Sequence, residues 1–154
     1  MVPFCGYQMN PLLDALNRTI TFYHASDREL APGTQIRPQA GGHAKQDIED
    51  AFEKVRRESF PDRPPRIGSV FACPERKGFC DGKWRKHVYE IEIQGAEKIF
   101  WANAEMWTEA SWKPEYAESY ADSYWAYPVE PGSWHFFKEV LIYGGTVTVV
   151  SELR

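Results

Sequence analysis

Short runs of alternating hydrophobic and polar residues predict a series of β-strands along this chain. The clearest run is 87–93, in which Tyr89, Ile91 and Ile93 fall on one face and two glutamates fall on the other. Other runs, rich in β-branched and aromatic residues, predict strands at 19–24, 35–37, 68–72 and 98–101. Two more strands are expected within 138–150, and the Gly144-Gly145 pair between them predicts a tight hairpin turn.

Hydrophobic residues at helical spacing predict helices between these strands. In 46–60, Ile48, Phe52 and Val55 recur at this spacing, with acidic residues in the first turn and basic residues in the last. Asparagine followed by proline at 10–11 predicts a short N-terminal helix, an appendage within 1–18. From Pro114 onward, another helix is expected to place tyrosines on one face, either to pack on a sheet or to bind a partner. These are Tyr116, Tyr120, Tyr124 and Tyr127.

This order of elements predicts a single α+β domain over 1–154, with mostly antiparallel sheets and inserted helices. With 154 residues, of which 43% are hydrophobic and 15% aromatic, the chain is long and apolar enough to fold around its own core. Its formal charge of −4 argues against a general polyanion-binding surface, because non-specific nucleic-acid binding depends on many Lys and Arg residues.

Cysteine usage and hydropathy predict a soluble cytoplasmic protein. The three cysteines, Cys5, Cys73 and Cys80, are irregularly spaced and odd in number, which is typical of a reducing compartment rather than a disulfide framework. The N-terminus has no signal-peptide pattern and no run approaches about 20 apolar residues, so we expect no membrane partner. Cys73, Cys80 and His87 match no compact zinc pattern, and we expect no metal.

Two polar residues stand at the ends of apolar strands. Glu139 precedes the apolar run 140–142, where an acid has little packing reason to be, and His24 ends the strand 19–24. If both strands border one cleft, the carboxylate and the imidazole face the same ligand. The simpler alternatives are a solvated glutamate at a strand edge and a hydrogen-bonded histidine in the core.

Three segments resemble the motifs of the ADP-ribosyltransferase superfamily. Segment 22–26, followed by 30–33, is similar to the first motif of the small rifamycin-modifying members. Segment 69–72 resembles the second motif of the poly-ADP-ribose polymerase branch, and 138–143 resembles the third, in which a catalytic glutamate opens an apolar strand. The resemblance implies that superfamily's split two-sheet core. It also implies a mono-ADP-ribosyltransferase that cleaves NAD and transfers ADP-ribose to a macromolecule, with protein favoured over nucleic acid.

The resemblance further implies roles for single residues. Glu139 would hold the nicotinamide ribose and stabilise its positive charge, and His24 would hydrogen-bond the adenosine ribose. Other contacts to NAD are expected from the three motifs and from an arginine whose guanidinium suits the pyrophosphate. The expected contacts are Tyr23, Ala25, Ser26, Arg66, Ser69, Phe71 and Tyr143.

The sequence departs from the superfamily pattern in the second motif. The tyrosine that stacks on nicotinamide aligns with Val70, so Phe71, Tyr143 or another aromatic residue would have to replace it. Glu105 and Glu109 are reserve candidates for the catalytic acid.

Other functions stay open on the residues alone. With water as the acceptor, the protein would be an NAD glycohydrolase. Without turnover, it would be a binding module that grips a partner through a Trp-rich loop at 101–112. A basic loop at 75–86 is expected to be a surface loop, or else to grip nucleic acid or an acidic protein patch.

Overall fold

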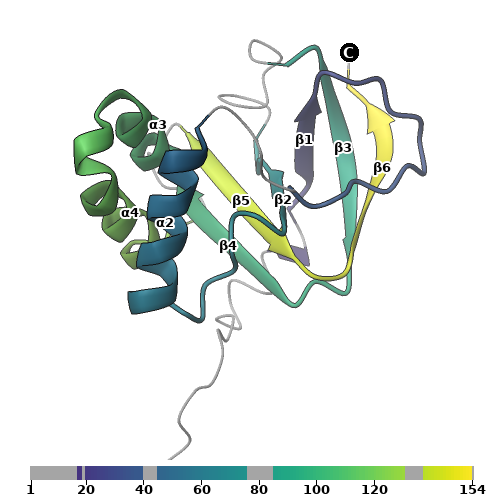
Figure 1. The fold of residues 1–154 in the computed structure, drawn as a ribbon. Coiled ribbons are helices and arrows are strands. Elements are labelled where there is room, and N and C mark those ends of the chain that lie inside the picture. The colour runs from purple at the N-terminus through teal and green to yellow at the C-terminus, as the bar shows by residue number, and fades with distance from the viewer. Residues whose placement is uncertain (1–16, 19, 40–44, 76–84, 131–136, 154) are drawn as a thin grey trace, which may run out of the picture.

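The fold consists of two antiparallel sheets and a layer of helices, as a computed structural model of the chain shows (Figure 1). The structure describes residues 17–18, 20–39, 45–75, 85–130 and 137–153. One sheet has the order β1 (Phe22–Ser26), β3 (His87–Gln94), β6 (Thr146–Glu152), and the other β2 (Ser69–Ala72), β5 (Lys138–Tyr143), β4 (Lys98–Asn103). The helices are α2 (Gln46–Ser59), α3 (Ala104–Trp112), the 3-10 helix η2 (Pro114–Tyr116) and α4 (Ala117–Ala126). The expected α+β class with mostly antiparallel sheets is confirmed.

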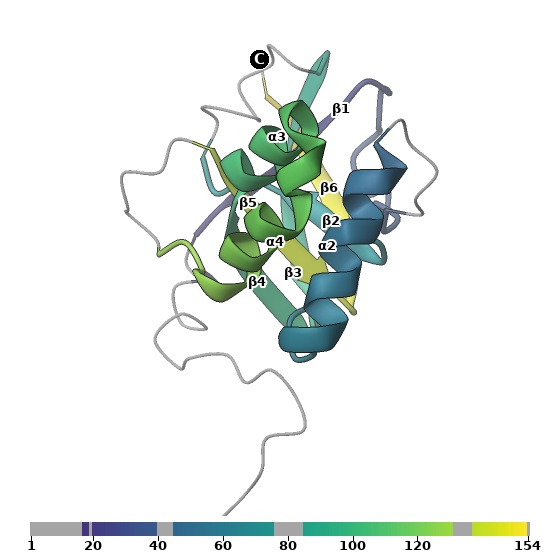
Figure 2. The ribbon, with the colours of Figure 1, turned by 60° about the vertical axis from the view of Figure 1, so that its left-hand side comes forward.

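The sheet β2-β5-β4 lies in the middle of the molecule. Helices α2, α3 and α4 cover one of its faces, and the sheet β1-β3-β6 packs on the other (Figures 1 and 2). On β5, Val140 and Ile142 point between the sheets and Leu141 points toward the helices. Because both faces of this strand are buried, its sequence is continuously apolar rather than alternating.

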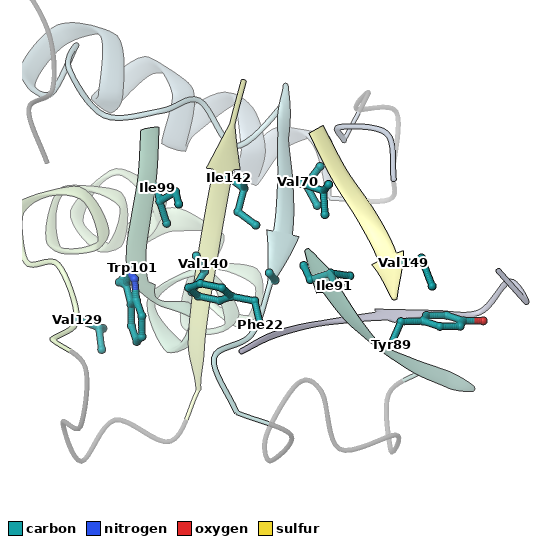
Figure 3. Close-up of a cluster of buried hydrophobic side chains, with 12 residues drawn as sticks. Phe22, Val70, Tyr89, Ile91, Ile99, Trp101, Val129, Val140, Ile142 and Val149 are labelled. Carbon is teal, nitrogen blue, oxygen red and sulfur yellow. The ribbon is translucent and has the colours of Figure 1, made fainter. Parts of the chain in front are cut away.

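The core between the sheets is built from alternate residues of all six strands that the structure describes (Figure 3). Phe22 of β1 meets Trp101 of β4 edge-on, with ring centroids 6.0 Å apart. Tyr89 and Ile91 face this core as the alternation in β3 predicts. Each such side chain stabilises the fold by about 1.5–3 kcal/mol through burial.

Helix α2 forms where the hydrophobic spacing predicts it. Ile48 and Phe52 are buried on its inner face, and the indole Nε1 of Trp125 donates to the carbonyl oxygen of Phe52 at 2.9 Å. Acidic residues lie in its first turn and arginines in its last, which complements the helix dipole. The helix therefore anchors the helical layer to the central sheet.

The expected hairpin at Gly144-Gly145 is wrong. Strands β5 and β6 follow one another in the chain but belong to different sheets, because both edges of β5 are already paired, with β2 and β4. Gly144 and Gly145 have φ values of +76° and +71°, and they turn the chain from one sheet to the other. A Cβ on Gly145 would lie 2.3 Å from the carbonyl oxygen of Gln94, so this turn is packed against the end of β3.

The expected Trp-rich loop at 101–112 is also wrong. Strand β4 continues to Asn103, whose side chain accepts a hydrogen bond from the backbone N–H of Glu105 and begins α3. Trp101 is 2% exposed in the core between the sheets, whereas Trp112 at the end of α3 is 79% exposed. Asparagine at this position is the helix-start signal that the sequence interpretation missed.

The four tyrosines after Pro114 do not share one buried face. Pro114–Tyr116 forms a 3-10 turn before α4 starts, and the helix ends at Ala126. Tyr124 is fully buried, while Tyr116 and Tyr127 are exposed. The packing interpretation thus holds for Tyr124. Tyr116 lies in the 3-10 turn and Tyr127 follows the last residue of α4, so neither ring shares the buried face.

Several expectations fall on residues outside the described part of the chain. Asn17 and Arg18 are helical, but the N-terminal helix expected before them, and most of the basic loop at 75–86, are not described. The strand expected at 35–37 is a single bridge, from Gln35 to Thr148 of β6. Among the helices that the structure describes, none combines the length and the apolar content needed to cross a bilayer.

The cysteine argument for a reducing compartment is not supported. Cys73, at the end of β2, is disulfide-bonded. Its two candidate partners, Cys5 and Cys80, both lie outside the described residues. Disulfides are typical of oxidising compartments. The odd number of cysteines therefore did not exclude a disulfide, and a cytoplasmic location stays a prediction.

Candidate functional site

A pocket of about 500 Å³ opens where β1, β2 and β5 meet. Strand β1 is tied to the end of β2 by a bridge between Tyr23 and Cys73, with both backbone N–H groups donating at 2.8 Å. This bridge links the two sheets and brings the ends of their strands together. Of the residues expected to bind NAD or catalyse its cleavage, those that line the pocket are His24, Ala25, Ser26, Ser69, Phe71 and Glu139.

His24 lines the pocket as a neutral imidazole held in one tautomer. Its Nδ1 lies 2.8 Å from the backbone carbonyl oxygen of Phe71. A carbonyl only accepts, so Nδ1 must carry the hydrogen, and Nε2 is left with a lone pair. Burial lowers the pKa of His24, and the nearby charge of Arg85 lowers it further, against the opposing hydrogen bond to Phe71. The residue is therefore hydrogen-bonded, as the core-histidine alternative expects, and also lines the pocket.

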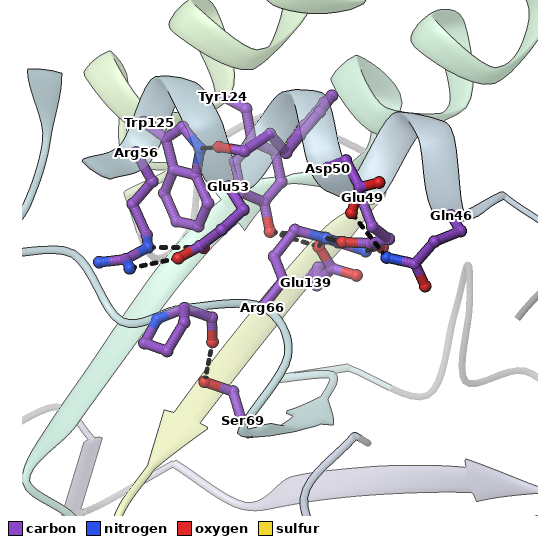
Figure 4. Close-up of polar contacts among 12 residues, drawn as sticks. Gln46, Glu49, Asp50, Glu53, Arg56, Arg66, Ser69, Tyr124, Trp125 and Glu139 are labelled. Atoms are coloured by element: carbon purple, nitrogen blue, oxygen red, sulfur yellow. Dashed lines mark hydrogen bonds and ion pairs between the residues drawn. The ribbon is translucent and has the colours of Figure 1, made fainter. Parts of the chain in front are cut away.

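Glu139 is fixed by two donors on one of its oxygens. Its Oε2 accepts from Nη1 of Arg66 at 2.5 Å and from the hydroxyl of Tyr124 at 2.6 Å (Figure 4). Within the described part of the chain, its Oε1 accepts no hydrogen bond, and 15% of the side chain is exposed. One edge of the carboxylate is thus bound to the protein interior, and the residue borders the pocket.

Arg66 is the centre of a buried polar network. It is 5% exposed, and it donates to both oxygens of Glu49, a residue of α2 that is only 2% exposed. Burial opposes its charge, but the charges of Glu139 and Glu49 outweigh burial and hold the pKa of Arg66 well above its ordinary value. Four rings surround its guanidinium carbon at 4.8–5.9 Å, those of Phe71, Tyr124, Trp107 and Phe52.

This burial differs from what the sequence suggests for Arg66. Its guanidinium was expected to meet the pyrophosphate of NAD, but Arg66 is 5% exposed, and the neighbouring Pro64 is fully buried. The Pro-rich segment that holds both residues connects the end of α2 to the start of β2, and it packs under the helices as it passes from one to the other. Arg66 consequently lies behind Glu139 and does not line the pocket.

Tyr124 completes the network from α4. Nη1 of Arg66 donates to its hydroxyl oxygen at 2.8 Å, and that hydroxyl donates onward to Glu139. Burial raises the pKa of Tyr124 well above its ordinary value, so the phenol is a neutral donor. Its ring packs edge-on against Trp125, with centroids 4.7 Å apart, and against Phe52 at 5.2 Å.

Cations outnumber carboxylates by one among the charged residues that line the pocket. Lys138 is paired with Glu75, which lies outside the lining, and Arg85 is paired with Asp27, each at 2.8 Å. The exposed Arg37 has no ion-pair partner among the described residues. A second pocket of about 350 Å³ adjoins the first and shares His24, Ser26, Arg37 and Gln39 with it. Together they form one groove whose lining holds more cations than carboxylates, on a protein whose net charge is negative.

The other expected contacts lie elsewhere. Tyr23 packs against Cys73 and Val88 and does not line the groove. Tyr143 lies at the far end of β5, paired with Ser69 and Lys98, and it lines no part of the groove. The reserve acids Glu105 and Glu109 are on α3 and do not line the groove either.

Val70 and Phe71 both line the pocket, but Val70 is 4% exposed and packs in the core between the sheets, whereas Phe71 points toward the helices. Of the two aromatic residues that the sequence offered in place of Val70, Phe71 lines the pocket and Tyr143 does not.

The sequence interpretation missed Glu49, Arg37 and the polar role of Tyr124. A signal for Glu49 was present, because its position on α2 falls between Ile48 and Phe52, on the face that the hydrophobic spacing assigns to the core. In the described ranges, no three His, Cys, Asp or Glu side chains are grouped as metal ligands would be.

Comparison with known proteins gives a family but no activity. No curated protein matches the chain. Residues 23–154 match the family model DUF2441, described as a protein of unknown function. The match covers most of the chain, which therefore belongs to the DUF2441 family.

Proposed function

We propose that this DUF2441 protein is a mono-ADP-ribosyltransferase with NAD as its substrate and a protein as its acceptor. The observation that supports this most is that His24 and Glu139, which lie far apart in the sequence, line one pocket. Nδ1 of His24 is held by the backbone, so Nε2 is the nitrogen left for a ligand. Glu139 likewise has one oxygen held by protein donors and one without a hydrogen bond from the described residues.

The chemistry that such a pocket favours is cleavage of the bond between ribose C1′ and the nicotinamide nitrogen. The bonding electron pair leaves with nicotinamide, which becomes neutral, while positive charge develops on the ribose. A fixed carboxylate beside the ribose, the role proposed for Glu139, lowers the barrier electrostatically. The nucleophilic atom of the acceptor then bonds to C1′ and releases its proton.

The charge of the groove suits the pyrophosphate of a dinucleotide. Arg37 contributes a guanidinium without an ion-pair partner in the described part of the chain, at the junction of the two adjoining pockets. Guanidinium groups bind phosphate oxygens in a bidentate manner. In this proposal, Arg37 takes the role that the sequence suggested for Arg66, and Phe71 supplies the aromatic face for nicotinamide.

The proposal is tested by incubating the protein with NAD labelled in its adenosine part, in the presence of cell lysate, and following nicotinamide release by chromatography. For the wild type we expect nicotinamide release and label on a protein band. Glu139→Gln keeps the shape and leaves Arg66 paired with Glu49, so we expect near-normal stability and a rate at least about 10²-fold lower. Glu105→Gln is the matched control, since Glu105 does not line the pocket, and it should turn over NAD like the wild type.

The products separate the alternatives. Label recovered in free ADP-ribose, and not on a protein, would indicate an NAD glycohydrolase instead of a transferase. Unchanged NAD with the wild type would contradict both enzymes and favour a binding module. Full activity of Glu139→Gln would exclude a catalytic role for Glu139, even where the wild type consumes NAD.

A further inference from the structure

The buried partners of Glu139 carry an inference that rests on the proposed function. We infer that Glu49 is a positioning residue for Glu139: acting through Arg66, it leaves the negative charge of Glu139 available to the pocket, while Tyr124 fixes the orientation of that carboxylate. None of these three partners lines the pocket.

The charge count of the network supports the role of Glu49. An isolated ion pair of Arg66 and Glu139 would be neutral, and the guanidinium would cancel most of the electric field that Glu139 exerts on a cationic sugar. Arg66 instead makes three hydrogen bonds to Glu49, at 2.9, 3.0 and 3.1 Å, and one to Glu139. With the phenol of Tyr124 neutral, the described groups Glu49, Arg66 and Glu139 together carry one net negative charge, and Glu139 is the one of the three that lines the pocket.

The hydrogen bonds of the network support the orientation of Glu139. Arg66 and Tyr124 both donate to Oε2, so rotation of the carboxylate would break two hydrogen bonds. Tyr124 is itself rigid, since its ring is fully buried between aromatic neighbours and its hydroxyl also accepts from Arg66. Preorganisation of this kind removes the need to reorient a charged group during the reaction.

Packing alone does not account for Glu49. A carboxylate that is 2% exposed must lose nearly all of its hydration, and a buried ion pair is commonly no more stable than apolar side chains of similar size. Glu49 lies on α2 beside Ile48 and Phe52, where an apolar residue would extend the core. A role in tuning the charge at Glu139 gives this carboxylate a reason to be there.

The test compares Glu49→Gln with a matched change on the same helix. Glu53 binds Arg56 through both of its oxygens and does not line the pocket, so Glu53→Gln also removes a carboxylate that pairs with an arginine. For Glu49→Gln we expect kcat for nicotinamide release to fall about ten- to a hundredfold, with KM for NAD within about twofold of wild type. Glu53→Gln should change neither constant beyond about twofold. Circular dichroism at the assay temperature confirms that each variant is folded.

Tyr124→Phe and Tyr120→Phe repeat the test in a form that disturbs folding less, because each removes only a hydroxyl. Tyr120 is on the same helix and packs against the helical core, and among the described residues it makes no hydrogen bond to Glu49, Arg66 or Glu139, so it serves as the control. Tyr124→Phe should lower kcat about tenfold or more, and Tyr120→Phe should not.

A double-variant cycle separates positioning from a general structural role. If Glu49 and Tyr124 act through Glu139, then Glu49→Gln or Tyr124→Phe should lower the residual rate of Glu139→Gln by no more than about twofold. Wild-type kcat in folded Glu49→Gln and Tyr124→Phe, or full additivity in the cycle, would overturn this inference and leave the proposed function intact. Absence of NAD turnover in the wild type would overturn both.

Discussion

Replacing Arg66 by Met tests whether the candidate site depends on one buried guanidinium. Methionine fills a similar volume and makes favourable contacts with aromatic rings, so it suits the ring-lined space that Arg66 occupies. It leaves Glu49 without the three hydrogen bonds from Arg66, and Glu139 without one of its two donors. Removing one partner of a buried ion pair costs about 3–5 kcal/mol, which is large against a typical total stability of about 5–15 kcal/mol.

The assay is urea denaturation followed by circular dichroism, with Arg57→Met as the comparison. Arg57 is on the exposed side of α2, with 69% of its side chain exposed and a loose contact of 3.7 Å to Glu53, so its replacement should change the unfolding free energy by less than about 0.5 kcal/mol. Adding Glu49→Gln and Glu139→Gln to Arg66→Met removes the uncompensated charges and should recover much of the loss. An Arg66→Met protein within about 1 kcal/mol of wild type would refute the network as the support of Glu139.

Three further outcomes are expected. Gly145→Ala should destabilise the protein by about 2–5 kcal/mol, because the residue has a positive φ and a Cβ there would clash with backbone atoms. Gly33→Ala should cost only about 1–2 kcal/mol, because Gly33 has a φ of +88° but open space around it. Equal losses in a denaturation experiment would contradict the packing at Gly145. Because burial lowers the pKa of His24, the unfolded chain binds this proton at higher pH than the folded protein. The unfolding free energy of the wild type should therefore fall as pH drops from about 6.5 toward the folded-state pKa, and it should fall more than that of His24→Gln. Parallel pH profiles of the two proteins would contradict the lowered pKa of His24. Arg37→Gln should raise KM for NAD several-fold with little change in kcat, and an unchanged KM would exclude a role of Arg37 in substrate binding.

Local patterns in the sequence predicted most individual elements. The spacing of Ile48, Phe52 and Val55 gave the helix that became α2, and the alternation around Tyr89 gave β3, because such periodicities follow from helix and strand geometry alone. The pairing of strands was not predictable in the same way. Gly144-Gly145 has the positive φ values of a hairpin turn, yet β6 pairs with β3, since that choice depends on which strand edges remain open.

The candidate site was predicted only in part, because local patterns mark single residues but not the partners that the fold brings to them. His24 and Glu139 could be proposed because each interrupts or ends an apolar strand, and the structure brings both to one pocket. Arg66 was expected to contact the pyrophosphate, and its Pro-rich segment gives no local signal that the guanidinium is buried. Glu49 was counted as a helix-dipole acid, because its partner lies in another segment and becomes visible only once α2 packs over β5.

The most direct test of the account is a crystal structure of Glu139→Gln soaked with NAD, since this variant should bind the dinucleotide without cleaving it. We expect NAD in the groove that His24 and Arg37 line, with its nicotinamide ribose against residue 139 and a hydroxyl of a ribose donating to Nε2 of His24. NAD bound elsewhere on the protein, or absent from this groove at concentrations that saturate the wild type in turnover, would contradict it.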